Sequence, residues 1–289
     1  MKKSVDLNPV VIPESYNYFA VFLTFLCNLN CSYCINHFEH RIIKRKVVSG
    51  KDWVRALNRV ISRPDLPVTL QGGEPSMHPD FIYIINNLKS GLNIDILTNL
   101  GFDIKEFIKK VDPQRIKRES PYASIRVSFH PEQMDIDELS KKVIMLLDRG
   151  YSVGIWGVMH PLYEKRILEA QEQCKALGID FRLKEFIGEY KHKLYGTYKY
   201  EGACFKKNKK KVLCKTTELL IDSQANVFRC HADLYAGENS LGSILDPDFR
   251  IEDKSRDCDN FGYCNPCDIK VKTNRFQRFG HTSVEITAI

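Results

Sequence analysis

Three cysteines near the start of the chain, Cys27, Cys31 and Cys34, have a spacing that suits one metal centre. Thiolates at a Cys-x3-Cys-x2-Cys spacing can bind three irons of a 4Fe–4S cluster, which leaves the fourth iron without a protein ligand. Closely spaced cysteines also occur in zinc sites and in ordinary ferredoxin-type sites. Three nearby cysteines with no fourth are unusual for a closed structural site. The trio therefore favours a cluster with one open iron that can bind a further molecule.

A second group of cysteines lies near the other end of the chain. Fifteen residues separate Cys214 from Cys230, and two separate Cys264 from Cys267. Four such ligands suit a second iron–sulfur cluster, and a zinc knuckle that clamps the C-terminal part is the structural alternative. Cys258 precedes Cys264 by six residues and either replaces one of the four or stays a free thiol. Ten cysteines grouped in this way predict two metal sites in a reducing, cytoplasmic compartment rather than a disulfide framework.

Alternating strand and helix patterns predict the elements that position the first group. Apolar, β-rich segments predict six strands, at about 18–26, 67–71, 93–98, 123–128, 152–159 and 180–185. Amphipathic segments between them predict helices at about 50–62, 79–90, 103–110, 135–149 and 163–177. From the second strand on, this alternation at intervals of roughly 26 to 30 residues predicts βα units and a parallel sheet.

Polar side chains follow the ends of the predicted strands. They are Cys27 after the first strand, Gly72-Gly73-Glu74 after the second, Thr98-Asn99 after the third, Ser128 and His130 at the fourth, His160 after the fifth, and Lys184-Glu185 at the sixth. Ligands of parallel α/β folds bind at the carboxyl ends of the strands, where the loops converge. The sequence therefore predicts one binding site at that end of a barrel.

The pattern changes after about residue 188. Residues 189–216 are rich in Lys, Tyr and Gly without a clear period, and residues 218–230 predict a β-hairpin with a turn at 222–226. We therefore expect an N-terminal extension at 1–17, a core at 18–188 and a small α+β domain at 189–289 that is built around the hairpin.

Two motifs give the core a resemblance to a known family. Cys27-Asn-Leu-Asn-Cys31-Ser-Tyr33-Cys34 resembles the signature of the radical SAM superfamily, and Gly72-Gly73-Glu74-Pro75 is similar to its GGEP motif. The resemblance covers roughly residues 18–188. It implies a partial (β/α)6 barrel, a 4Fe–4S cluster on the three cysteines and S-adenosylmethionine (SAM) on the open iron. It also implies cleavage of SAM to a 5′-deoxyadenosyl radical that abstracts a hydrogen atom from a substrate.

The resemblance also implies roles for the residues at the strand ends. Gly72 and Gly73 would let the backbone approach the methionine part of SAM, where a side chain would obstruct it. Glu74 or neighbouring backbone, with Pro75 completing the motif, would accept hydrogen bonds from the SAM ammonium, and Tyr33 would lie near the adenine. Polar positions that match the family's contacts with the rest of SAM are Thr98, Asn99, Ser128 and His130. The alternative for these four is capping of free backbone groups at strand ends.

The C-terminal cysteines resemble those of the Twitch domain, a shortened relative of the SPASM domain. The resemblance implies one auxiliary 4Fe–4S cluster on Cys214, Cys230, Cys264 and Cys267. A fully ligated cluster would transfer electrons, whereas a free Cys258 could donate a hydrogen atom to a substrate radical. Cys204 is expected to be an inert thiol.

These features favour an enzyme that oxidises or epimerises a small polar substrate, such as a sugar or cyclitol, with a reducing donor such as flavodoxin or ferredoxin. A peptide-modifying maturase is the alternative, although the 26 residues before Cys27 are too few for a leader-binding domain. A non-enzymatic metal-binding scaffold is a remote third possibility, since GGEP would serve no purpose there. The lysine-rich stretch 206–211 is expected to be a solvated loop rather than a nucleic-acid site, and no apolar run approaches the roughly 20 residues of a membrane span.

Overall fold

The computed structural model describes residues 8–36, 46–272 and 281–289, and its centre is a nine-stranded sheet in the order β14-β13-β12-β2-β4-β5-β6-β7-β8. Six of these strands run parallel: β2 (Tyr18–Thr24), β4 (Val68–Gly72), β5 (Ile94–Thr98), β6 (Ile125–Phe129), β7 (Val153–Met159) and β8 (Phe181–Glu185). The six strands lie side by side in chain order, as expected for a partial (β/α)6 barrel. The predicted α/β fold class is confirmed.

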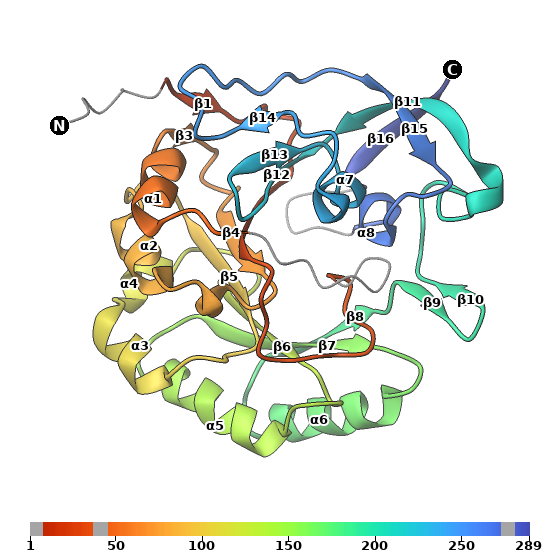
Figure 1. Cartoon of the computed structure of the whole chain (residues 1–289). Helices are drawn as coiled ribbons and strands as arrows, with labels where there is room; N and C mark the ends of the chain where they lie inside the picture. The colour runs from red at the N-terminus through yellow and green to blue at the C-terminus, as the bar shows by residue number, and fades with distance from the viewer. Residues whose placement is uncertain (1–7, 37–45, 273–280) are drawn as a thin grey trace.

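Helices connect the strands and lie in an arc outside the sheet (Figure 1). They are α1 (Gly50–Asn58), α2 (Phe81–Asn87), α3 (Ile104–Lys110), α4 (Pro113–Ile116), α5 (Ile136–Leu147) and α6 (Glu164–Ala176). Side-chain caps start several of them, since Ser49 accepts a hydrogen bond from the Asp52 amide and Asp135 accepts one from the Glu138 amide. All five predicted helices are present.

Alternation along each strand separates the helix-covered side of the sheet from its interior side. Val127 and Phe129 of β6 belong to the main apolar core. Arg126 and Ser128 point the opposite way, because successive side chains of a strand face opposite sides. Ser128 therefore faces the barrel interior at the carboxyl end of β6, where the sequence places a binding residue.

The barrel interior is closed near the amino ends of its strands by a buried ionic network. Asp95 of β5 is fully buried and accepts hydrogen bonds from Arg118 at 2.7 and 2.9 Å and from Arg126 at 3.2 Å. The Tyr122 hydroxyl donates to the same carboxylate at 3.2 Å. A paired and hydrogen-bonded charge of this kind is the form in which a buried carboxylate is tolerated. The interior is thus filled at one end, and the loops at the other end remain available for a ligand.

Two details differ from the sequence-based prediction in this half of the chain. The helix expected over 50–62 ends at Asn58, and Val60–Ile61 forms a short strand, β3, parallel to β1 (Val10–Val11). Four β-branched residues in register explain why the chain leaves the helix there. No helix in the described ranges has the length and apolar character needed to cross a bilayer.

The C-terminal part contributes to three sheets, one of which is the two-stranded pair of Gly188–Tyr190 and Lys193–Tyr195. Its elements are β9 (Gly188–Tyr190), β10 (Lys193–Tyr195), η3 (Lys206–Asn208), β11 (Lys210–Thr216), β12 (Glu218–Ile221), β13 (Asn226–Phe228), α7 (His231–Ala236), β14 (Gly242–Ser243), β15 (Arg256–Phe261), α8 (Pro266–Ile269) and β16 (Val284–Ala288). Strands β15, β11 and β16 form a separate three-stranded sheet. The predicted hairpin is present as β12 and β13, but β12 pairs in parallel with β2 and so extends the barrel sheet. The stretch without a clear period, 189–216, contains three strands whose partners are distant in sequence or lie in a tight hairpin.

Candidate functional site

The loop that carries the first cysteine trio leaves the carboxyl end of β2 and is fixed from the far side of the barrel mouth. Cys27 is exposed, Cys31 is buried and Cys34 is half-buried. Two backbone amides between the cysteines donate to side chains of the loop after β6: Asn30 N to Gln133 Oε1 and Ser32 N to Glu132 Oε2, both at 2.8 Å. The cysteine loop is therefore held by hydrogen bonds that do not involve the thiols.

The three thiols affect one another electrostatically. Burial raises the pKa of Cys31 to about 12, and the neighbouring Cys34 and Cys27 sulfurs add to the effect. Burial also raises the pKa of Cys27, against a hydrogen bond from the Leu29 amide. Without a metal, raised pKa values favour the protonated thiols of Cys27 and Cys31, so iron binding must displace protons and is favoured at higher pH. Among the residues that the structure describes, no three His, Cys, Asp or Glu side chains are arranged to hold a single metal ion.

The GGEP loop is joined directly to the start of the cysteine loop. Gly73 N donates to Thr24 O and Glu74 N donates to Leu26 O, both at 2.8 Å. A Cβ on Gly72, whose φ is +145°, would lie 2.0 Å from Thr24 O, and one on Gly73 would lie 2.2 Å from Leu26 O. In this structure Gly72 and Gly73 are needed because the backbones of the two loops are in contact. From the sequence, the expected reason was close approach of SAM.

Glu74 is buried beneath this junction, with 1% of its surface exposed. Its Oε1 atom accepts hydrogen bonds from Ser76 Oγ at 2.6 Å, from Ser76 N at 3.2 Å and from Thr98 Oγ1 at 2.7 Å, and its Oε2 atom accepts one from Asn99 N at 2.7 Å. Pro75 begins the short helix η2 (Pro75–Met77), which Glu74 caps. The carboxylate therefore fastens the end of β4 to the end of β5.

Asn99 connects the end of β5 to the cysteine loop. Its Nδ2 donates to Asn28 Oδ1 at 2.9 Å and approaches Cys27 Sγ at 3.6 Å. Its Oδ1 is buried and finds no hydrogen-bond partner among the described residues. A buried acceptor without a partner is costly, so a ligand that donates a hydrogen bond there would relieve the cost. This fits the predicted role of Asn99 in cofactor binding.

Tyr33 lies in an aromatic group built from the ends of β6 and β7. Its hydroxyl hydrogen-bonds His130 Nδ1 at 3.2 Å, and its ring stacks on His160 with centroids 4.9 Å apart and lies 5.8 Å from the ring of Tyr163. Burial lowers the pKa of His130 to about 4, so this ring is neutral at pH 7, and burial raises the pKa of Tyr33. Three positions that the sequence indicated, Tyr33, His130 and His160, thus share one apolar, uncharged surface.

The C-terminal cysteines gather in a second apolar cluster between the three-stranded sheet and helices α7 and α8. The cysteines of this cluster are Cys204, Cys214, Cys230, Cys258 and Cys264, and burial also raises the pKa of Cys267 nearby. Cys230 caps α7 by accepting a hydrogen bond from the Asp233 amide at 3.4 Å. Cys204, which the sequence did not place with the candidate ligands, also packs against this cluster, and its Sγ donates to Cys264 O at 3.3 Å. No disulfide joins any of the ten cysteines, all of which lie in the described ranges.

Cys214 and Cys258 lie on the neighbouring antiparallel strands β11 and β15, on the same face. Their side chains share a hydrogen bond, which raises the pKa of Cys214 and lowers that of Cys258. Both are buried. Cys258 is therefore placed among the candidate ligands, next to Cys214.

Several residues of the site were not identified from the sequence. Asn28 lies inside the cysteine motif, and Glu132 and Gln133 follow His130 by two and three residues, so their positions at strand ends were a usable signal. Asn36 and Tyr235 are hydrogen-bonded to each other across 199 positions of the chain, which no sequence pattern indicates. His37 lies outside the described residues.

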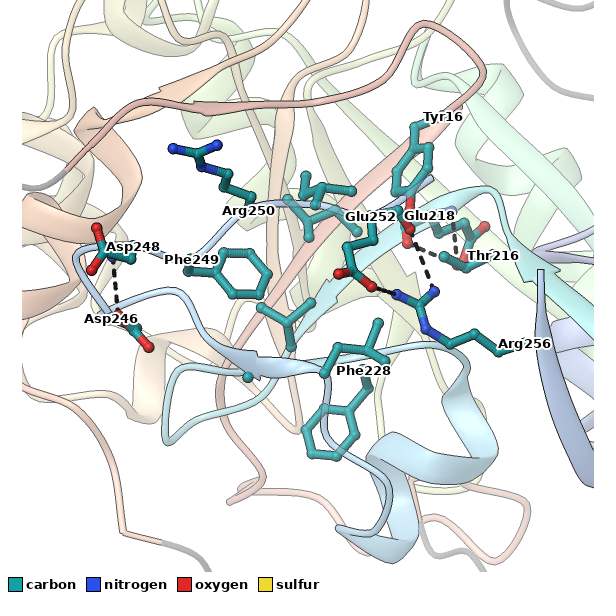
Figure 2. Close-up of a pocket in the computed structure, with 15 residues that line it drawn as sticks. Tyr16, Thr216, Glu218, Phe228, Asp246, Asp248, Phe249, Arg250, Glu252 and Arg256 are labelled. Atoms are coloured by element: carbon teal, nitrogen blue, oxygen red, sulfur yellow. Dashed lines mark hydrogen bonds and ion pairs between the residues drawn. The ribbon is translucent and has the colours of Figure 1, made fainter. Parts of the chain in front are cut away.

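A cavity of about 400 Å³ lies apart from both cysteine groups (Figure 2). It is lined in part by Tyr16, Phe249 and Arg250, and by Arg256, which forms an ion pair with Glu252 at 2.9 Å. None of the cysteines or GGEP residues lines it.

Comparisons with known proteins agree with this geometry. Residues 21–118 match the model of the Radical SAM superfamily. The "Probable GTP 3',8-cyclase" of Methanococcus aeolicus is 24% identical over 185 residues, which are 58% of each chain. The "GTP 3',8-cyclase" of Mannheimia succiniciproducens is 25% identical over 113 residues, 37% of this chain and 34% of the relative. That of Actinobacillus succinogenes is 29% identical over 92 residues, 31% of this chain and 27% of the relative.

The chain thus spans less than two thirds of these curated relatives. Among solved structures, native anSMEcpe with bound AdoMet superposes with a TM-score of 0.51 at 13% identity, over 82% of this chain and 79% of that one. The same protein with AdoMet and Kp18Cys peptide gives a TM-score of 0.50. At this identity the likeness concerns the fold. The family model thus matches a Radical SAM domain at residues 21–118, and the relatives that the chain resembles carry enzyme names.

Proposed function

We propose that this chain binds a 4Fe–4S cluster through Cys27, Cys31 and Cys34 and uses it to cleave SAM reductively. When bound, the cluster and SAM supply a 5′-deoxyadenosyl radical that removes a hydrogen atom from the substrate. The observation that carries the proposal is the junction of the cysteine loop with the GGEP loop, through Gly73 N to Thr24 O and Glu74 N to Leu26 O. It puts a metal-binding loop and a glycine-lined backbone in direct contact at the mouth of a barrel.

We expect different residues around this junction to contact different parts of SAM. Backbone groups of Gly72 and Gly73 and the unpartnered Asn99 Oδ1 would receive the polar methionine part of SAM. The neutral aromatic surface of Tyr33 and His130 suits an adenine ring, and Ser128 faces the interior nearby. These residues would bind the cofactor and orient it.

We infer that the C-terminal cysteines hold an auxiliary 4Fe–4S cluster in a Twitch-like domain at about 189–289. The ligands implied by the sequence are Cys214, Cys230, Cys264 and Cys267, and the position of Cys258 beside Cys214 favours Cys258 as a ligand over a free hydrogen donor. A buried, apolar and cysteine-rich surrounding suits a cluster that exchanges electrons with a substrate radical.

The substrate we favour is a small polar molecule that is oxidised or epimerised, with flavodoxin or ferredoxin as electron donor. The relatives are named for GTP, which supports a small molecule over a macromolecule. A peptide substrate is the second candidate, because a solved structure of anSMEcpe, which shares the fold, holds a peptide together with AdoMet.

Anaerobic reconstitution with iron and sulfide tests the proposal. The unaltered protein should bind about eight irons per chain, as two four-iron clusters require, and should cleave SAM when reduced. Replacing Cys27, Cys31 and Cys34 together by Ala should leave about half of the iron and abolish cleavage, measured as 5′-deoxyadenosine. Retained cleavage in that variant, or zinc in place of iron, would refute the assignment.

Cys174→Ala is the matched control, since Cys174 is buried outside both groups, against Ser140. Its iron content and SAM cleavage should equal those of the unaltered protein. Cys258→Ala separates the two roles left open for that thiol: loss of the auxiliary iron makes it a ligand, whereas full iron content with stalled turnover makes it a hydrogen donor.

A further inference from the structure

A two-step hydrogen-bonded link connects the C-terminal region to the GGEP loop. Asn36 follows the third cysteine of the motif by two residues, and its Nδ2 donates to Gly72 O at 2.7 Å. The Oδ1 atom of the same amide accepts a hydrogen bond from the Tyr235 hydroxyl at 2.9 Å. Since Gly72 O can only accept, it requires the Nδ2 end of the amide, and the Tyr235 hydroxyl holds the amide in place from its Oδ1 end.

Tyr235 is held firmly enough to serve as an anchor. It lies on α7, the helix that begins after Cys230, and only 5% of its surface is exposed. Its ring meets the edges of Phe22 and Phe25 with centroids 6.0 and 6.3 Å apart. Edge-to-face packing of this kind fixes the ring plane, and so the direction of the hydroxyl.

The acceptor at the other end of the link is a sensitive part of the site. Gly72 adopts a φ of +145°, which side chains rarely allow, and its Cβ position is occupied by Thr24 O. The peptide that follows Gly72 carries the carbonyl that Asn36 holds and the Gly73 amide that bonds Thr24 O. A change in the orientation of the Asn36 amide would bring Oδ1 against Gly72 O, where two acceptors repel.

We propose that Tyr235 is a positioning residue for SAM binding, which acts through Asn36 on the Gly72 carbonyl. The C-terminal region then sets the affinity of the barrel for its cofactor without contacting that cofactor. This inference rests on the proposed function, because SAM is the ligand whose binding it describes.

SAM affinity of reconstituted protein with the oxidised cluster, measured by equilibrium dialysis, tests the link without turnover. Tyr235→Phe should keep its iron and weaken SAM binding by about five- to tenfold, the effect of one lost hydrogen bond. Tyr151→Phe is the control: it removes another buried hydroxyl, the one that donates to Val111 O, and should leave SAM binding unchanged. The EPR signal of the reduced cluster should shift less on addition of SAM in Tyr235→Phe than in the control.

Asn36→Ala tests the same link from its other side, without a change in the α7 packing. If the two residues act in series, the double variant should bind SAM no more weakly than Asn36→Ala alone. Equal SAM binding by Tyr235→Phe and the unaltered protein, or losses that add in the double variant, would overturn the inference and leave the proposed function standing. Failure of the unaltered protein to bind SAM would overturn both.

Discussion

At the residue scale, Glu74 is the polar group on which the site geometry depends most. Its carboxylate is 1% exposed and accepts hydrogen bonds from Ser76, Thr98 and Asn99, which belong to the ends of two neighbouring strands. Hydrogen bonds to a charged acceptor are about twice as strong as neutral ones. The carboxylate therefore sets the separation of the GGEP loop from the β5 loop.

Glu74→Gln should destabilise the metal-free protein by about 1–3 kcal/mol, because the new amide nitrogen faces donors and leaves at least one of them unpaired. Urea unfolding followed by circular dichroism measures the change. Glu169→Gln, on an exposed side chain of α6, should change stability by less than about 0.5 kcal/mol. Equal stability of the two variants would contradict the claim that the hydrogen bonds to the Glu74 carboxylate stabilise the protein.

At the element scale, the β12–β13 hairpin is predicted from the sequence, but its position beside β2 in the barrel sheet is not. Leu220 of β12 lies beside Ala20 of β2 in parallel register, and both belong to an apolar cluster with Phe22, Phe228 and Tyr235. Strand β2 leads directly into the cysteine loop. The hairpin thus covers the edge of the sheet at the strand that leads into the cysteine loop, and protects that edge from pairing with another chain.

Leu220→Ala should lower the free energy of unfolding by about 2–5 kcal/mol, because Leu220 is fully buried and its truncation leaves a cavity. Denaturant titration of the metal-free protein reports the loss. Leu177→Ala, at a side chain that is 49% exposed, is the matched control and should cost far less. A small effect at Leu220 would mean that the hairpin is not integral to the barrel sheet.

At the scale of the whole molecule, Arg59 ties the first half of the chain to the last. Its guanidinium is buried after α1 and donates to the carbonyls of Ile244, Asp246, Pro247 and Phe249, at 2.6–3.3 Å. Burial lowers the pKa of Arg59, against the nearby Asp246 and Asp248 carboxylates. One side chain therefore satisfies four carbonyls of a segment that has no sheet partner of its own at these positions among the described residues.

Arg59→Met keeps most of the apolar length of the side chain and removes the Arg59 donor from the carbonyls of Ile244 and Phe249, whereas Asp246 O and Pro247 O keep the bonds from Phe249 N and Asn8 N. We expect a loss of about 2–4 kcal/mol in the free energy of unfolding, since buried unsatisfied groups cost about 1–3 kcal/mol each and some become hydrated. Differential scanning calorimetry should show a lower Tm. The exposed Arg166→Met should show no such loss, and equal Tm values for the two variants would contradict the role of Arg59 as a tie.

An element can be predicted from the sequence when local patterns stabilise it, and it cannot when its partners are distant along the chain. The six strands and five helices of the core are present because period-2 and period-3.6 patterns are local. The ends of strands β4, β5 and β6 could be located for the same reason. Glu74, Thr98 and His130 at these ends could therefore be named as candidate site residues from the sequence. The strands within 189–216 could not be located, because β11 is stabilised by β15 and β16, more than 40 residues away in the chain.

The sequence by itself thus determined which residues are candidates for the chemistry: which thiols form the trio, which glycines follow the second strand, and that both lie at strand ends. Only the tertiary structure decided how these parts are held. It showed that Gly72 and Gly73 are required by the carbonyls of Thr24 and Leu26, and that Tyr235 reaches Asn36 across 199 positions. The physical reason is that spacing records which residues neighbour each other along the chain, whereas contact between distant segments depends on how the sheet closes.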